Sequence, residues 1–129
     1  MEDFCIEEKC KITLIGTHVY EHMMSQYKTT LTSAGCLVRM PTFDHTSQSN
    51  SAYDIMMLNK ESIEWCDEVH MFWDQRSLGT LIDFGMTIGL GKLLRVVFVE
   101  NRTILDGIME YEKRSQKATH LAQKKGSNK

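Results

Sequence analysis

Residues 68–92 constrain the fold of this chain more than any other stretch. An apolar run with the composition of a buried strand, residues 69–73, is followed by a short polar loop, residues 74–79. A helix is then predicted over residues 80–90, with apolar side chains at helical spacing at Leu81, Phe84 and Ile88. This order places free backbone N–H groups and the positive end of a helix dipole at one edge of a sheet, where a phosphate or sugar can bind.

Strand-like and helical patterns alternate along the whole chain. The predicted strands are Lys11–Ile15 and residues 36–40, 69–73 and 94–99. The predicted helices are residues 17–34, a helix from the Ser51-x-x-Asp54 capping box to about Trp65, residues 80–90, and a last helix capped by Thr103. Parallel strands need right-handed crossovers, so the pattern predicts a single-domain, doubly wound α/β fold of the flavodoxin or Rossmann type. Its expected strand order is 2-1-3-4, with a possible extra edge strand.

The predicted strand order locates a ligand site. The loops after the first and third strands flank the point where the winding of the sheet reverses, and ligands of open α/β sheets bind at that point. Residues 16–20 and 74–80 are therefore expected to face each other across one crevice. Residues 42–51 are polar and irregular, and they form a candidate lid or binding loop.

Composition indicates a soluble globular domain. The 129 residues are 42% hydrophobic and 25% charged, and no apolar run approaches the roughly 18 residues of a membrane span. The N-terminal residues are acidic and lack the apolar core of a secretory signal. Four cysteines without a C-x-x-C pair favour reduced thiols in a cytoplasmic protein and no metal site: Cys5, Cys10, Cys36 and Cys66.

Charge is distributed unevenly along the chain. Residues 113–129 contain six Lys and Arg and no acid, whereas nine Lys and Arg against 17 Asp and Glu give residues 1–112 a net charge of −8. We therefore divide the chain into an α/β domain, residues 1–112, and a basic helix end or tail, residues 113–129. The acidic domain argues against a nucleic-acid partner, and a solvated helix end or a disordered terminus accounts for the basic residues.

Three short motifs occur in this order: Asp67-Glu68-Val69, Ser77-Leu78-Gly79-Thr80 and Asp83-Phe84-Gly85. Their order and spacing resemble the signature of the nucleoside 2-deoxyribosyltransferase superfamily, which includes deoxynucleoside 5′-monophosphate N-glycosidases. The resemblance covers roughly residues 12–99. It implies cleavage or transfer of the N-glycosidic bond of a nucleoside or nucleotide by a homo-oligomer, a dimer or larger, without a metal or organic cofactor. The alternative is a non-catalytic nucleotide-binding or sensing module on the same scaffold.

The resemblance also implies roles for individual residues. Asp83 falls on the family's nucleophilic Glu, which holds a covalent deoxyribosyl intermediate, and Asn59 falls on an Asp near the nucleobase. Ser77 falls where transferases have an Asp on the sugar hydroxyls and monophosphate hydrolases a phosphate-binding Ser. The other expected substrate-binding residues lie on the two loops or the end of the third strand: Gly16, Thr17, Tyr20, Trp73, Gly79 and Thr80.

Several of these residues also have structural explanations. Thr80-x-x-Asp83 has the form of a capping box, and Ser77 and Gly79 are common turn residues. Asn59 shares a core-facing helical stripe with Ile55 and Ile63, so its amide either bonds the backbone or faces the crevice. Trp73 either stacks on a base or packs in the core or against a subunit.

The chain also departs from the family pattern at three points. Asp83 is one methylene shorter than Glu, a shift of about 1 Å that can cost on the order of 100-fold in rate. Asn59 cannot transfer a proton as an Asp does. The first loop lacks the arginines expected of a monophosphate binder, and His18 and Arg76 are the candidates to supply positive charge instead.

Overall fold

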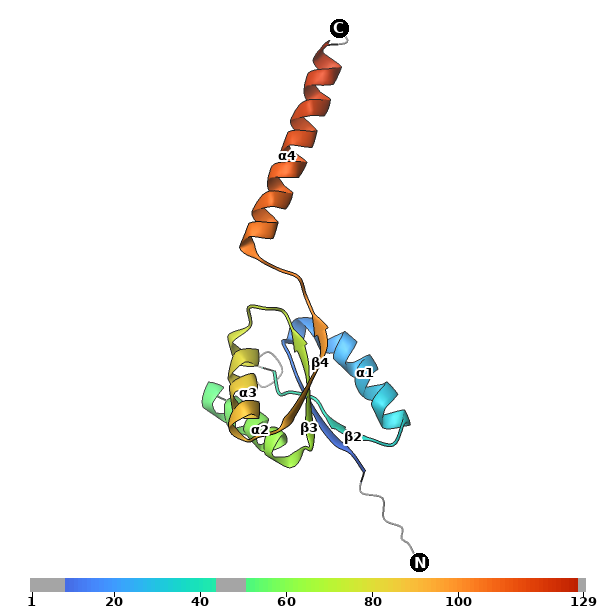
Figure 1. The fold of residues 1–129 in the computed structure, drawn as a ribbon, viewed down its shortest axis with the longest axis vertical. Helices are drawn as coiled ribbons and strands as arrows, with labels where there is room; N and C mark the ends of the chain where they lie inside the picture. Colours follow the sequence, from blue (N-terminus) through green and yellow to red (C-terminus); the bar gives the residue numbers. More distant parts are fainter. Residues whose placement is uncertain (1–8, 44–50, 128–129) are drawn as a thin grey trace, which may run out of the picture.

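The predicted strands all form one parallel sheet in the computed structural model, which describes residues 9–43 and 51–127 (Figure 1). The order is β2-β1-β3-β4, as predicted, and every neighbouring pair is parallel. No fifth strand occurs within the described residues. The strands are β1 (Lys11–Ile15), β2 (Leu37–Arg39), β3 (Glu68–Trp73) and β4 (Leu93–Val99).

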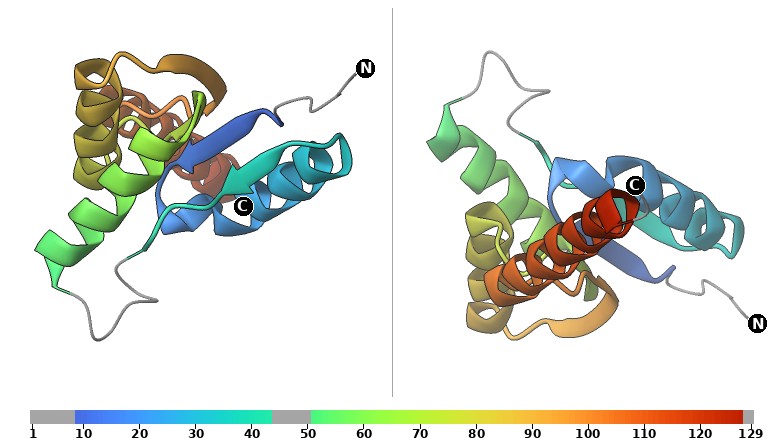
Figure 2. Two further views of the ribbon diagram at one scale, coloured as in Figure 1. Left: turned by 90° about the horizontal axis from the view of Figure 1, so that it is seen from below. Right: turned by 90° about the horizontal axis from the view of Figure 1, so that it is seen from above.

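Helices cover both faces of this sheet, as expected of a doubly wound fold. The helical elements are η1 (His18–Tyr20), α1 (Glu21–Ser33), α2 (Ala52–Trp65), α3 (Leu78–Gly89) and α4 (Ile104–Ser127). Figures 1 and 2 show α1 on one face of the sheet and α2 with α3 on the other. None of the helices in the described part of the chain is both long enough and apolar enough to cross a lipid bilayer.

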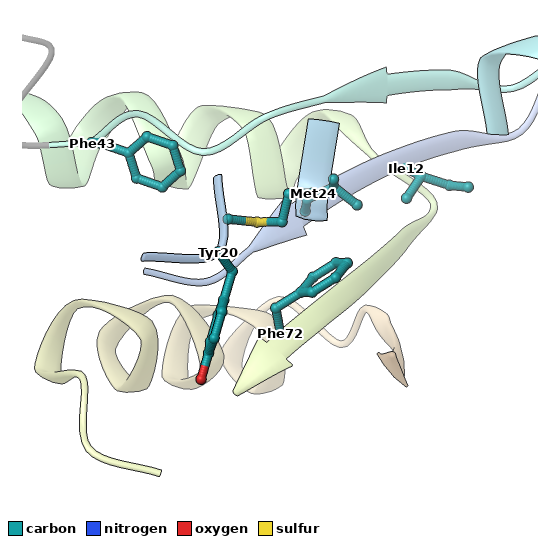
Figure 3. Packing of buried hydrophobic residues seen from close by; sticks show 6 residues of the cluster. Ile12, Tyr20, Met24, Phe43 and Phe72 are labelled. Carbon is teal, nitrogen blue, oxygen red and sulfur yellow. The ribbon is translucent and has the colours of Figure 1, made fainter. Parts of the chain in front are cut away.

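Alternation of side chains along β1 supplies both layers of the core. Ile12 and Leu14 point towards α1, where they join the buried Met24 and Phe72 (Figure 3). Ile15 points the other way and joins a second cluster with Ile63 of α2. The intervening Thr13 is also buried, and its hydroxyl donates to the Ser62 carbonyl at 2.7 Å, which ties β1 to α2. One strand therefore connects the two halves of the core.

A buried polar chain fastens α1 to the centre of the sheet. His70 of β3 is 3% exposed. Its Nδ1 lies 2.6 Å from the Tyr27 hydroxyl of α1, and its Nε2 lies 2.9 Å from Glu68 Oε1. Both ring nitrogens are thus satisfied inside the protein, which a buried imidazole requires.

Capping residues explain where most helices begin and end. The capping box predicted at the start of α2 is present, because Ser51 Oγ accepts from Asp54 N while Asp54 Oδ2 accepts from Ser51 N. Gly35 follows α1 with φ of 99°, the conformation expected of a glycine stop. Thr103 Oγ1 accepts from Asp106 N at 2.9 Å, so the predicted cap of α4 is confirmed.

The start of α3 differs from the prediction. Ser77 is the N-cap, and its Oγ accepts from Thr80 N, so the helix begins at Leu78 and the proposed Thr80–Asp83 capping box does not form. The turn before it fixes this start, since Asp74 Oδ1 accepts from the backbone N–H groups of Arg76 and Ser77. Such an Asx turn leads directly into a helix, which the pattern of apolar residues alone does not reveal.

The buried face of α3 also differs from the expected one. Thr80, Asp83 and Thr87 point inward, whereas Leu81 is 44% and Ile88 is 64% exposed. Phe84 alone of the expected stripe packs against the core. Apolar residues occur almost all around α3, so spacing could not single out one face, and the small threonines fit a close approach to the neighbouring elements.

The last helix stands away from the sheet and its covering helices (Figure 1). It runs without a break across residue 112, where we divided the chain, and continues to Ser127. The apolar residues of its first part, residues 104–117, are exposed, among them Ile104, Ile108 and Tyr111. The packed body of the described chain therefore ends at β4.

We expect Gly35→Ala to lower the free energy of unfolding by about 1–2 kcal/mol, because a Cβ is strained at positive φ even though no atom crowds this site. Urea denaturation measures the loss. Gly85→Ala is the matched control, since Gly85 is helical with open space around it, and it should be neutral or stabilising by up to about 1 kcal/mol. Equal losses in the two variants would contradict this account of Gly35.

Candidate functional site

A cavity of about 460 Å³ opens at the carboxyl ends of β1 and β3. The loop after β1 contributes Gly16 and Thr17, and the start of α3 contributes Ser77 and Gly79. The segment after β2 and one side of α2 complete the wall. The structure therefore brings the two predicted loops to one cavity. The lining residues are Gly16, Thr17, His18, Pro41, Thr42, Phe43, Ala52, Ile55, Met56, Asn59, Ser77, Gly79, Thr80, Ile82 and Asp83.

Gly16 lets the first loop lie directly on the neighbouring strand. A Cβ at this position would stand 3.0 Å from the Phe72 carbonyl oxygen and 3.1 Å from Phe72 Cβ. It would also lie 3.3 Å from Met24 Sδ. A Cβ this close would make the loop or the strand shift by a few tenths of an ångström, so glycine allows the closest approach. The loop that follows then bends into η1, with the Thr17 side chain accepting from Val19 N.

Asp83 forms part of the cavity wall from the inner face of α3. The residue is 6% exposed, and none of the described residues forms a hydrogen bond with its carboxylate. Burial removes the carboxylate from water without a compensating partner and raises its pKa to about 7. A carboxyl group in this state changes charge near neutral pH, which is typical of catalytic carboxylates.

The N-terminus of α3 presents hydrogen-bond donors to the same cavity. Ser77 Oγ accepts from Thr80 N at 3.3 Å and from Thr80 Oγ1 at 3.1 Å, so the Ser77 hydroxyl proton can be donated to a ligand. Gly79 lies one residue further and is exposed. A Cβ there would meet only Ser77 Oγ, at 3.9 Å. Thr80 is 2% exposed, and its hydroxyl is engaged with Ser77.

Asn59 lines the cavity, but its amide is committed to the backbone of Thr42. Its Oδ1 accepts from Thr42 N at 2.8 Å, and its Nδ2 donates to the Thr42 carbonyl at 3.3 Å. Of the two arrangements considered for the amide, the structure has the backbone-bonded one. Asn59 thereby fixes the segment containing Pro41 and Phe43, which forms the opposite wall.

Tyr20 and Trp73 do not line this cavity. The Tyr20 hydroxyl is bonded to Glu100, and its ring packs edge-on against Phe98 with the ring centroids 5.2 Å apart. Burial, reinforced by Glu100, raises the pKa of Tyr20. Trp73 is partly buried against the core cluster between the sheet, α2 and α3. Core packing was one of the interpretations of Trp73, beside stacking on a base and contact with a subunit, and it describes this side chain.

A second, smaller hollow of about 330 Å³ adjoins the cavity. Thr17 and Ser77 line both spaces, and Tyr20 lines only the hollow. Arg76 and Arg102 bring positive charge to it, although Arg102 is paired with Glu100. Arg102 follows β4 and reaches the same sheet edge. In the sequence, its position just after a strand is the only sign that it lies near the site.

The sequence identified the wall formed after β2 only in part. Thr42 and Phe43 fall in the candidate binding loop over residues 42–51, whereas Pro41, Ile55 and Met56 were not singled out as site residues. Pro41, Phe43, Ile55 and Met56 line the cavity but carry no catalytic motif. The candidate lid over residues 42–51 lies largely outside the described residues, since residues 44–50 are not described. Within the described part of the chain, no group of three or more His, Cys, Asp and Glu side chains is arranged to hold a metal ion.

Two solved structures share this architecture. A 2-deoxyribosyltransferase from Leishmania mexicana matches with a TM-score of 0.59 and 18% sequence identity, over 76% of this chain and 70% of that one. The protein has a deoxyribosyltransferase-like fold. A CMP N-glycosidase from Clostridium botulinum matches with a TM-score of 0.53 and 18% identity, over 78% of this chain and 81% of that one. No protein-family model and no curated protein matches the sequence.

We expect Asp83→Asn to stabilise this protein increasingly as pH rises from 5 to 8. The folded-state pKa of Asp83 is raised, so the folded protein binds this proton more tightly than the unfolded chain does. Stability is therefore lost between about pH 4 and pH 7 as the buried group ionises. An amide avoids this loss, and the gain at pH 8 should be roughly 2–4 kcal/mol.

Urea denaturation of both proteins at pH 5, 6, 7 and 8 measures this difference. Asp106→Asn serves as the control, because Asp106 lies exposed in the first turn of α4. A stability difference between Asp83→Asn and the unsubstituted protein that stays constant with pH would show that the Asp83 pKa is not raised.

Proposed function

We propose that the protein binds a nucleoside or nucleotide in this cavity and cleaves or exchanges its N-glycosidic bond, with Asp83 as the nucleophile. The observation that carries the proposal is a buried carboxylate without a hydrogen-bond partner among the described residues, in the wall of a cavity beside a helix N-terminus. The fold supports it, because the solved structures that share it include a 2-deoxyribosyltransferase and a CMP N-glycosidase.

Asp83 has the properties that such a reaction requires. Its ionised oxygen attacks the anomeric carbon while the carbon–nitrogen bond breaks, and the base leaves with the bonding electron pair. The negative charge stabilises the oxocarbenium-like transition state, and the resulting glycosyl ester is then cleaved by water or by a second base. A carboxylate that no protein donor holds retains its full nucleophilicity when ionised.

The rest of the site can hold the substrate. A cavity of about 460 Å³ lies within the range of small-molecule sites. Phe43, Ile55 and Met56 make part of the cavity wall apolar, and a base can pack against such a surface. The Ser77 hydroxyl and the N-terminus of α3 can bind the sugar or a phosphate, and the Arg76 side chain of the adjoining hollow adds positive charge.

Asn59 then acts as a positioning residue rather than a proton donor. Both ends of its amide hold Thr42, so it keeps Pro41 and Phe43 against the cavity. Trp73 and Tyr20 also act indirectly. Trp73 packs the edge of the sheet, and Tyr20 fixes Glu100 by a hydrogen bond.

A non-catalytic nucleotide-binding module is the second candidate, and the Asn59 contacts favour it. The Asn59 amide is bonded to the Thr42 backbone and is not an acid, so Asn59 cannot protonate the departing base. The short side chain of Asp83 acts in the same direction, because it keeps the carboxylate further from the anomeric carbon than a Glu would.

We expect deoxynucleosides, their 5′-monophosphates or NAD to release free base when incubated with the protein. Chromatography of the products measures the rate. Asp83→Ala should lower it by at least about 1,000-fold, since the covalent step is lost, whereas Asp106→Asn should leave it unchanged. Asp83→Glu should raise it, by up to about 100-fold, because the carboxylate gains reach.

The rate should also rise with pH and level off above about pH 7, as Asp83 ionises. Base release that persists in Asp83→Ala would rule out Asp83 as the nucleophile. The sensing module would be established instead if calorimetry shows saturable binding of the same compounds and neither the unsubstituted protein nor Asp83→Glu turns them over.

A second copy of this chain is the partner that we propose. Large apolar side chains are exposed along α3, β4 and α4, and a monomer rarely leaves so many uncovered. They include Leu78, Ile88, Leu93, Val96, Ile104, Ile108 and Tyr111. The two parts of the chain have opposite net charges, +6 for residues 113–129 and −8 for residues 1–112, so the basic part of one copy is complementary to the acidic part of another. A basic α4 end can thus lie on the acidic body of a neighbour.

We expect light scattering at micromolar concentration to give at least the mass of a dimer. Ile104→Glu and Ile108→Glu should each raise the dissociation constant by about tenfold or more, because a charge would be buried in the contact. Tyr53→Glu is the control, since Tyr53 is an exposed aromatic residue on α2. A monomeric unsubstituted protein would exclude this partner.

A further inference from the structure

Cys10 and Cys36 lie side by side where the ladder between β1 and β2 begins. Lys11 pairs with Leu37 in the parallel register, so one step towards the N-terminus Cys10 stands opposite Cys36. The Leu37 N–H donates to the Cys10 carbonyl at 2.9 Å, which fixes this pairing. Nothing in the sequence indicates the pair, because a whole strand–helix crossover separates the two residues.

The two side chains also share one face of the sheet. Alternate residues along a strand point the same way, so Cys10 follows Ile12 and Cys36 follows Val38. Both cysteines pack against the core cluster under α1. The two thiols are close enough to interact, since Cys36 is among the groups that raise the pKa of Cys10.

This arrangement meets the geometric requirement for a disulfide. Neighbouring strands are about 4.8 Å apart, so the two Cα atoms are separated by roughly 5 Å, inside the range of about 4.4–6.8 Å that a disulfide spans. Both thiols are free, and both residues are only partly buried. A small oxidant can therefore reach them.

We propose that Cys10 and Cys36 form a redox-active dithiol that a small disulfide such as oxidised glutathione converts to an intramolecular disulfide. One thiol loses its proton to solvent and attacks the small disulfide, which forms a mixed disulfide and releases one glutathione thiolate. The other thiol, likewise deprotonated, attacks the protein sulfur of that mixed disulfide and releases the second glutathione. The two cysteines are oxidised, and the two glutathiones that leave are reduced.

Cys66 is not expected to react with the small disulfide, so among the described cysteines oxidation should be confined to Cys10 and Cys36. Cys66 is 1% exposed, and its Sγ donates to the Ile63 carbonyl at 3.2 Å. A buried, hydrogen-bonded thiol of this kind is inert towards small disulfides. Burial, reinforced by Glu68, raises the pKa of Cys10, so oxidation should be slow at neutral pH and faster in mild alkali.

The disulfide would fasten the weakest strand of the sheet. β2 has three residues and lies at the sheet edge, paired only with β1. The bond closes a loop of roughly 26 residues that contains η1 and α1, and it restricts the unfolded chain accordingly. The pair lies at the amino end of the strands, whereas the cavity lies at their carboxyl end, so oxidation should leave ligand binding intact.

The test is to incubate the full chain with oxidised glutathione at pH 8 and to map its disulfides by mass spectrometry. We expect a Cys10–Cys36 bond and loss of two hydrogens. The melting temperature should rise by about 10 °C and return when dithiothreitol is added. Cys5→Ser should behave identically, which shows that Cys5 takes no part.

Cys10→Ser and Cys36→Ser provide the matched controls. Each should stop at a mixed disulfide with one glutathione on the remaining cysteine and show no such rise in melting temperature. The proposal is overturned if both cysteines of the unsubstituted chain end as separate glutathione adducts, if both stay reduced in the folded protein, or if either pairs with Cys5. None of these results depends on whether the cavity binds or cleaves a nucleoside.

Discussion

The absence of a side chain at Gly16 is the constraint from which the site follows. The backbone after β1 lies against Phe72 so closely that a single added carbon would contact both the carbonyl oxygen and the Cβ of that residue. This contact holds the first loop beside β3, and the loop that leaves β3 then begins α3 next to it. A bulkier residue would push the loop and the strand apart by at least a few tenths of an ångström and so disturb the cavity at the carboxyl ends of β1 and β3.

The inward face of α3 is polar, which is unusual for a helix that covers a sheet. Two of its three buried polar residues are satisfied within the helix, because Thr80 bonds Ser77 Oγ and the Thr87 hydroxyl donates to the Asp83 carbonyl at 2.8 Å. The Asp83 carboxylate has no such partner among the described residues. A buried carboxyl group that its surroundings leave unsatisfied costs stability, and such costs persist mainly where a function needs the group.

The sequence predicted those parts of the fold that depend on local periodicity and turn chemistry. Short apolar runs between helices were enough for the sheet order 2-1-3-4, and the Ser51 box and Gly35 marked the ends of helices. It also predicted that the loops after β1 and β3 meet, since topology alone requires this. The motif spacing singled out Asp83, which lies in the cavity wall.

What the sequence could not supply were contacts between distant segments and the choice among several apolar faces. Tyr20 bonds Glu100 across 80 residues, so a residue expected beside the substrate instead fastens the end of β4. Asn59 likewise finds Thr42, and no local pattern distinguishes that contact from an open amide. In α3 the apolar residues surround the helix, so burial was decided by close packing rather than by periodicity.

β2 connects the Cys10–Cys36 pair to the cavity. Its amino end carries Cys36 beside Cys10, and the chain beyond its carboxyl end becomes the Pro41–Phe43 wall that Asn59 holds by the Thr42 backbone. A three-residue edge strand has too few ladder bonds to resist fraying by itself, so its position depends on these attachments at both ends. With the thiols reduced, the amino end is held by packing and by two backbone hydrogen bonds, from Leu37 N to the Cys10 carbonyl and from Cys36 N to the Leu31 carbonyl. The Asn59 amide holds the other end by two further hydrogen bonds. The two ends are thus held by separate sets of contacts, so oxidation at the amino end would stiffen the strand without moving the wall of the cavity.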